Sequence, residues 1–216
     1  MMAGVPEMRL PLLWLGLGLM LCLPACSRSS DAENSVTNSK QNPHPTQRYD
    51  ITMTIADAPG PFASVKGFMQ FDVVNDECLP PPNSNPSGYS SPTPTIEIST
   101  IFARISDTEY VGAFYTDMMV DEDYYGEGVC HWLLMDTRVR LEATGAPGET
   151  RFLPSLPAES LHAGQAVTTY FTKNSYPRDA DIENYPDLGM SDPNKYKPEL
   201  RGQLFSITLT PKKVIQ

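Results

Sequence analysis

Hydrophobic and polar residues alternate along several short stretches of this chain, a pattern typical of β-strands with one buried face. The clearest case is Tyr49, Ile51, Met53 and Ile55, which alternate with polar residues. Similar alternation predicts further strands at residues 65–74, 95–105, 110–115, 129–135, 138–143, 166–172 and 203–210. About eight or nine short strands predict a mainly β fold, as a single antiparallel β-sandwich-like domain.

The same alternation predicts which side chains face the core. Met69, Phe71 and Val73 share one face of a predicted strand, and Ile96, Ile98, Ile101 and Ala103 are expected to point inward in the next. In the last strand, Phe205, Ile207 and Leu209 alternate with Leu204, Ser206 and Thr208. Residues 95–115 and 129–143 are each predicted to form a hairpin, the second turning at Asp136 and Thr137. Only residues 158–162 favour a short helical turn.

Two long stretches interrupt the strands. Residues 80–94 are rich in proline, and residues 173–198 are polar and rich in proline and aspartate. No helix fits the first of them, because proline lacks the backbone donor that a helix needs. Each is either a plain surface excursion or a loop that presents a binding surface.

An apolar run from Leu10 to Leu23 follows Arg9 near the start of the chain. Its 14 residues are too few to span a membrane, which takes about 20. A basic residue, an apolar run and small residues indicate a secretory signal, which begins at Met1 or at Met8. The run ends in Leu23-Pro24-Ala25-Cys26, which resembles the lipobox of bacterial lipoproteins.

The lipobox resemblance implies that residues 1–25 are removed and that Cys26 carries the lipid. The alternative is an ordinary secretion signal whose last removed residue is Ala25, in which case Cys26 follows it by coincidence. Residues 26–48 are then expected to be the lipidated cysteine and a flexible polar tether, about 25 Å long on average. The folded domain is predicted at residues 49–216. Ser27 is not the aspartate associated with inner-membrane retention, so the outer membrane is favoured.

Export decides how the cysteines are interpreted. Cys22 leaves with the signal and Cys26 is used for lipidation, which leaves Cys78 and Cys130 in an oxidising compartment. We therefore predict a disulfide between them. In the chain-entropy model a loop of this size contributes about 4 kcal/mol of stability.

Charge narrows the choice of partners. The formal net charge is -10, and it stays at that value without the signal because Glu7 and Arg9 cancel. Such acidity excludes nucleic acid as a partner, since phosphates would be repelled. It also provides no electrostatic attraction to anionic lipid. It suits a basic protein partner, or it serves only solubility.

The residues with the most chemical potential lie at 117–132, where carboxylates and tyrosines crowd before Cys130. An EF-hand does not fit, because Trp132 stands where the closing carboxylate belongs. A less regular calcium site, a protein-binding patch and a plain acidic loop remain as alternatives. The candidate partner interface consists of Asp117, Asp121, Glu122, Asp123, Tyr124, Tyr125 and Glu127.

No enzyme is predicted. The three histidines are His44 in the tether, His131 beside Trp132, and His162 in a loop. We expect His131 to be a packed structural residue rather than a base. The sequence has no nucleophile elbow, zinc-protease motif or phosphate-binding loop.

The arrangement as a whole resembles that of periplasmic immunity lipoproteins: lipobox Cys26, polar tether, and one acidic, disulfide-bonded β domain. Such proteins inhibit secreted antibacterial toxins, including lipases and cell-wall hydrolases. The resemblance implies a membrane-anchored periplasmic inhibitor with a toxin as its partner. The alternatives are an accessory envelope lipoprotein of a secretion or assembly complex, and a calcium-binding β module.

Overall fold

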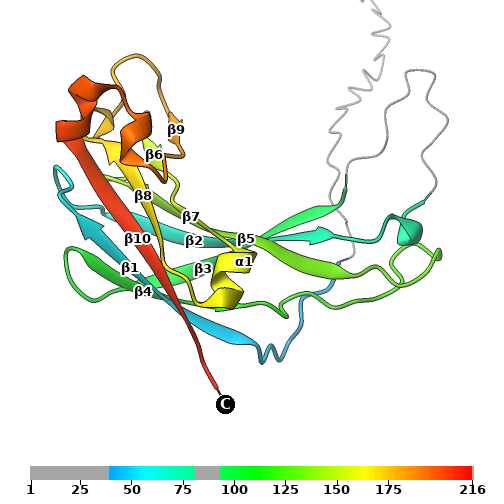
Figure 1. Ribbon diagram of the computed structural model, residues 1–216. Helices are drawn as coiled ribbons and strands as arrows, with labels where there is room; N and C mark the ends of the chain where they lie inside the picture. The colour runs from blue at the N-terminus through cyan, green and yellow to red at the C-terminus, as the bar shows by residue number, and fades with distance from the viewer. Residues whose placement is uncertain (1–38, 81–92, 216) are drawn as a thin grey trace, which may run out of the picture. The chain divides into compact units, whose positions relative to one another are not determined.

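The computed structural model describes residues 39–80 and 93–215, which form ten strands and one α-helix (Figure 1). The strands are β1 (Arg48–Ala56), β2 (Ser64–Val73), β3 (Thr95–Arg104), β4 (Glu109–Tyr115), β5 (Trp132–Glu142), β6 (Arg151–Phe152), β7 (Ser155–Pro157), β8 (Val167–Thr172), β9 (Pro186–Asp187) and β10 (Leu204–Lys213). The helix is α1 (Ala158–Ala163), and 3-10 turns lie at η1 (Asp76–Cys78), η2 (Lys173–Ser175), η3 (Pro193–Lys195) and η4 (Pro198–Gln203). The protein is therefore mainly β. The predicted signal and Cys26 lie outside the described residues, as does most of the proline-rich stretch.

All of these strands belong to one sheet. Its order is β8-β10-β1-β4-β3-β2-β5-β6-β9, with β7 paired to β5 beside this path. β3 links the two halves, because residues 95–101 pair with β2 and residues 102–104 pair with β4. β6 and β9 run parallel, whereas the other pairs are antiparallel. Where a two-layer antiparallel sandwich was expected, the strands form one mixed sheet that is nearly closed into a barrel.

The two ends of the sheet meet just beyond β9. Tyr170 on β8 and Met190 exchange backbone hydrogen bonds of 2.8 and 3.0 Å. Gly189 permits this approach, since its φ is +62° and a Cβ there would lie 2.5 Å from both Thr169 Cγ2 and the Tyr170 carbonyl oxygen. Closing a sheet in this way removes exposed strand edges that could pair with other chains.

The core occupies the inside of this curved sheet. The alternating faces predicted for β1, β2 and β10 are confirmed, and in each strand the apolar face is the buried one. One end of the core is a cluster of aromatic rings with neighbouring centroids 5.2–6.2 Å apart, formed by Phe62, Phe152, Phe171 and Phe205. The predicted helical turn is also confirmed as α1.

The hairpin predicted at residues 129–143 is wrong, because residues 132–142 form the single strand β5. A β-bulge explains the error. Gln70 pairs with Asp136 and Phe71 with Leu134, which leaves Met135 as an extra residue on β5. Buried residues of β5 have even numbers before the bulge and odd numbers after it. The alternation in the sequence is therefore interrupted, as it would be between two separate strands.

The inward face predicted for the second half of β3 is also wrong. Ile101 is 86% exposed and Ala103 is exposed, whereas Phe102 is buried. Residues 98 and 102 have the same parity, so β3 keeps one period throughout. Inward positions for Ile101 and Ala103 would require the alternation to change from even to odd residue numbers after Ile98. Gly67 and Gly112 instead leave room for the ring of Phe102, whose atoms would lie 2.7–2.8 Å from a Cβ at either glycine.

The predicted tether ends earlier than expected. Residue Gln41 forms an antiparallel bridge with Met119, and the Val120 amide donates to the Lys40 carbonyl at 3.0 Å. The Asn42 amide donates to the Met118 carbonyl at 2.7 Å. The described part of the predicted tether therefore belongs to the folded unit, and the boundary at Tyr49 is too late.

Among the described residues, no helix has the length and apolar character needed to cross a membrane.

We predict that Gly189→Ala destabilises the protein by at least about 2 kcal/mol, because the methyl group meets backbone at a left-handed position. Gly164→Ala is the matched control: its φ is +67°, but nothing lies within 4 Å of the added Cβ. It should cost only the backbone preference, about 1 kcal/mol. Urea unfolding of the two variants measures the difference, and equal losses would contradict the role given to the Tyr170–Met190 closure.

Candidate functional site

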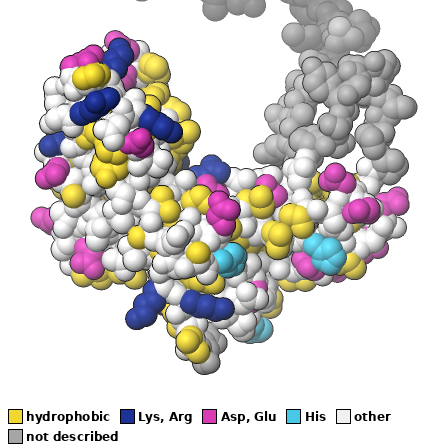
Figure 2. Space-filling model, in the orientation of Figure 1, with side chains coloured by type: hydrophobic (Ala, Val, Ile, Leu, Met, Phe, Trp, Pro, Cys, Tyr) yellow, Lys and Arg dark blue, Asp and Glu magenta, His cyan; other side chains and the backbone are white. Residues whose placement is uncertain are grey.

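An open groove of about 510 Å³ lies where three parts of the chain meet. One wall is the acidic segment, residues 117–132, joined by Gln47; the floor is the start of β5; and the other wall is α1. The lining residues are Gln47, Thr116, Asp117, Met119, Asp121, Trp132, Leu133, Leu134, Ala158, Glu159 and His162. In the space-filling view, hydrophobic and acidic side chains lie among one another across the middle of the face that Figure 1 shows (Figure 2).

The predicted disulfide is confirmed. Cys78 and Cys130 are bonded, with their Cα atoms 5.1 Å apart, and both are buried. Cys78 ends η1, just after β2, and Cys130 precedes β5. The bond therefore fixes the end of the acidic segment to the end of the β2–β5 pair.

Asp117 holds the wall of the groove to the start of the domain. Its Oδ2 accepts from the Thr46 amide at 2.8 Å and the Thr46 hydroxyl at 3.0 Å, and its Oδ1 accepts from the Gln47 amide at 3.0 Å. Burial by itself would raise the pKa of the Asp117 carboxyl, but these donors outweigh burial and lower the pKa. Asp117 is therefore used by the fold.

Asp121 is bonded to the first residue of β5 and to the residue before it. Its Oδ1 accepts from the Trp132 amide at 3.0 Å, and its Oδ2 lies 2.8 Å from His131 Nδ1. His131 is exposed, so its predicted role as a packed residue is wrong. It precedes β5 and pairs with an acid across the loop, which the neighbouring cysteine and tryptophan did not indicate.

Glu122 and Tyr124 are bonded to Lys40, which lies beside the bridge between Gln41 and Met119. Glu122 forms a 2.7 Å ion pair with Lys40. The Tyr124 hydroxyl donates to the Val120 carbonyl and accepts from the Lys40 amide at 3.3 Å. Its ring packs edge-on against Trp132, with centroids 6.4 Å apart.

The remaining predicted residues form the tip of the segment. Asp123 Oδ1 accepts from the Gly126 amide at 2.6 Å and from the Tyr125 amide at 3.3 Å, which closes a turn. Tyr125 is half-buried, and burial raises the pKa of its hydroxyl. Glu127 is exposed and has no hydrogen bond or ion pair within the part of the chain that the structure describes.

All seven predicted interface residues lie on the one segment 117–127, and most of their polar groups are bonded within the chain. The residues that are free to contact a partner are different ones. Leu133 is 56% exposed and lines the groove, and Met135, two residues further along β5, is 45% exposed. Trp132 beside them has a buried indole N–H with no acceptor among the described residues.

A signal for these missed residues exists in the sequence. Residues 132–135 are Trp-Leu-Leu-Met, a run of four apolar side chains on one strand. Because a strand sends successive side chains to opposite faces, two of the four cannot enter the same core. The strand predicted at residues 129–135 carried no assignment of faces, so the exposed pair Leu133 and Met135 was not predicted.

The carboxylates do not gather around a common point. Across residues 39–80 and 93–215, no three His, Cys, Asp or Glu side chains are grouped as a metal site requires. Their nearest partners are amides, hydroxyls, Lys40 and His131, as described above.

Comparison with known proteins does not assign the chain to a group: no family model, no curated protein and no solved structure matches it.

We predict that Asp117→Asn lowers the free energy of unfolding by about 1 kcal/mol at neutral pH, because the charged acceptor of three hydrogen bonds is lost. Since the folded state lowers the pKa of Asp117, its contribution is present above the pKa of the unfolded chain. The difference from the unmodified protein should therefore shrink as the pH falls through the folded pKa.

Glu127→Gln makes the same charge change in the same segment without removing a bond, and it serves as the control. Urea unfolding from pH 7 down to pH 3 provides the comparison. A loss that does not depend on pH, or that Glu127→Gln reproduces, would show that Asp117 does not hold the groove wall.

Proposed function

We propose that the protein is a lipid-anchored lipoprotein of the bacterial envelope that faces the periplasm and neutralises a secreted antibacterial toxin by binding it. It would use the groove along β5 as its contact surface. The observation that carries the proposal is exposed Leu133 in a groove whose acidic wall the fold holds in place, with exposed Met135 two residues further along the same strand.

Export and anchoring are supported by the lipobox resemblance at Leu23-Pro24-Ala25-Cys26. The Cys78–Cys130 disulfide agrees with an oxidising compartment, since such bonds are rare where thiols are kept reduced. Both features support a working surface outside the cytoplasm, where a toxin delivered by a competing cell would be met.

The rigidity of the groove supports a binding role. Asp117, Asp121 and the disulfide hold the wall at both ends, so little backbone freedom remains to be lost when a partner docks. Exposed aliphatic side chains next to a buried aromatic provide the apolar centre of an interface, with a polar rim around it. The overall negative charge would speed the encounter with a basic toxin.

Deleting the gene tests the proposal. A deletion strain mixed with its parent on solid medium should be outcompeted, because the parent delivers the toxin and the mutant has no inhibitor. A plasmid copy of the full chain should restore equal recovery. The same mixture in shaken liquid, where cells do not stay in contact, is the control. Equal recovery of the two strains under conditions in which the toxin is delivered would overturn the toxin assignment.

The groove itself is tested by Leu133→Lys combined with Met135→Lys. Both side chains are substantially exposed, so the variant should fold and accumulate normally. It should nevertheless fail to protect, because an ammonium group would be buried in the interface without a partner. Ile101→Lys changes an even more exposed aliphatic residue on β3 and should protect fully. Full protection by the double variant would remove the groove from the proposal.

A further inference from the structure

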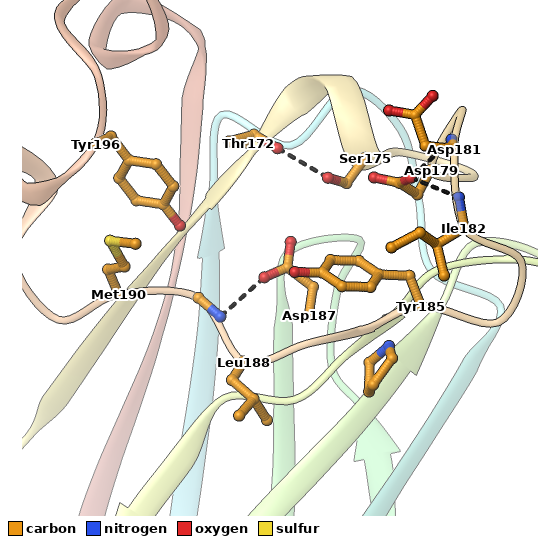
Figure 3. A pocket seen from close by; sticks show the side chains of 12 residues that line it. Thr172, Ser175, Asp179, Asp181, Ile182, Tyr185, Asp187, Leu188, Met190 and Tyr196 are labelled. Carbon is orange, nitrogen blue, oxygen red and sulfur yellow. Dashed lines mark hydrogen bonds between the residues drawn. The ribbon is translucent and has the colours of Figure 1, made fainter.

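A second cavity, of about 410 Å³, lies where residues 173–196 fold back over β8. It shares no lining residue with the groove on β5. Its size falls within the range of small-ligand sites, which is about 300–1,000 Å³. Figure 3 shows Asp187 in the middle of the lining residues, with Tyr196 and Met190 to one side and Asp179 and Asp181 to the other.

Asp187 is the unusual group in this cavity. It is only 8% exposed, yet it forms no ion pair with any Lys, Arg or His of the described residues. Its Oδ1 accepts from the Gly189 amide at 2.9 Å, and its Oδ2 has no hydrogen-bond partner in the described part of the chain. Burial raises the pKa of this carboxyl, and the charge of Asp179 raises it further. A carboxylate in such a place lacks the cation that would normally compensate its burial.

The walls of the cavity suit a cation on an aliphatic stem. Tyr185 and Tyr196 provide aromatic rings, whose faces attract ammonium and guanidinium groups. The Tyr196 hydroxyl donates to the Tyr170 carbonyl at 2.7 Å, which fixes the ring. Ile182 and Leu188 line the cavity with more than half of their surface exposed, and they could cover a chain of methylene groups.

The remaining acids reinforce the preference for positive charge. Asp179 and Asp181 also line the cavity, and no Lys, Arg or His of the described residues does. Asp179 Oδ1 is used by the loop, since it accepts from the Asp181 and Ile182 amides at 2.9 Å each. The field in the cavity is therefore negative.

We propose that this cavity binds an ammonium or guanidinium group on an aliphatic stem, with Asp187 as its counter-ion and Tyr185 and Tyr196 as its walls. The cation is either a lysine or arginine side chain of a protein or a free amine of the same chemistry. The site holds whether or not the protein neutralises a toxin, because it uses none of the groove residues.

Titration of the full-length protein in detergent tests the site, with Nα-acetyl-arginine methylamide and its lysine counterpart as probes. At least one should bind saturably, and Nα-acetyl-citrulline methylamide, which has a neutral group of nearly the same shape, should not. Free arginine separates the two sources of the cation. Tighter binding of free arginine points to a small molecule, whereas equal binding points to a protein side chain.

Asp187→Asn keeps the acceptor for the Gly189 amide and removes the charge, so affinity for the cationic probe should fall by about tenfold or more. Without ligand, this variant should melt no lower than the unmodified protein, because it loses an uncompensated buried charge. Tyr185→Leu provides a second variant, which removes an aromatic wall but no side-chain hydrogen bond of the described residues; it should also weaken binding. Equal binding of the citrulline probe, or unchanged affinity in both variants, would overturn the proposal.

Discussion

The backbone pairing of Tyr170 with Met190 is the contact on which the shape of the domain depends. It joins the two ends of the strand path, and it does so across an excursion that leaves β8 at Thr172 and returns to it at Met190. The excursion folds back over β8, and the cavity around Asp187 lies among residues of the excursion and Thr172 of β8. Gly189 is the position that lets the returning chain come close enough.

The two sites use their acidic residues in opposite ways. Along the groove, Asp117 and Asp121 accept hydrogen bonds from the chain itself, so their charges mainly stabilise the wall. In the cavity, Asp187 accepts only the Gly189 amide and keeps one oxygen without a partner among the described residues. A net charge of -10 therefore says little about where a cation would bind. What matters is which carboxylates the fold leaves uncompensated.

Alternation of apolar and polar residues predicted the long, regular strands such as β1 and β10. Burial of one face of such a strand requires an apolar residue at every second position. It failed at the bulge in β5, where one extra residue reverses the pattern within a continuous strand. It could not find β9, since two residues are too short to show any period. The groove combines residues far apart in the chain, so no local pattern marks it. The cavity is lined by residues 172–196 alone, but that stretch is polar and shows no regular period. The disulfide followed from the predicted export and from cysteine counting alone.

The order found at residues 40–47 shortens the segment between the folded unit and the cysteine that is predicted to carry lipid. If Cys26 carries lipid as predicted, only 12 residues separate it from Ser39, and such a chain reaches at most about 45 Å. The folded unit then begins beside Lys40, which is paired with Glu122 on the groove wall. Under that prediction the start of the folded unit lies within about 45 Å of the lipidated cysteine, which limits how far a docked partner could lie from it.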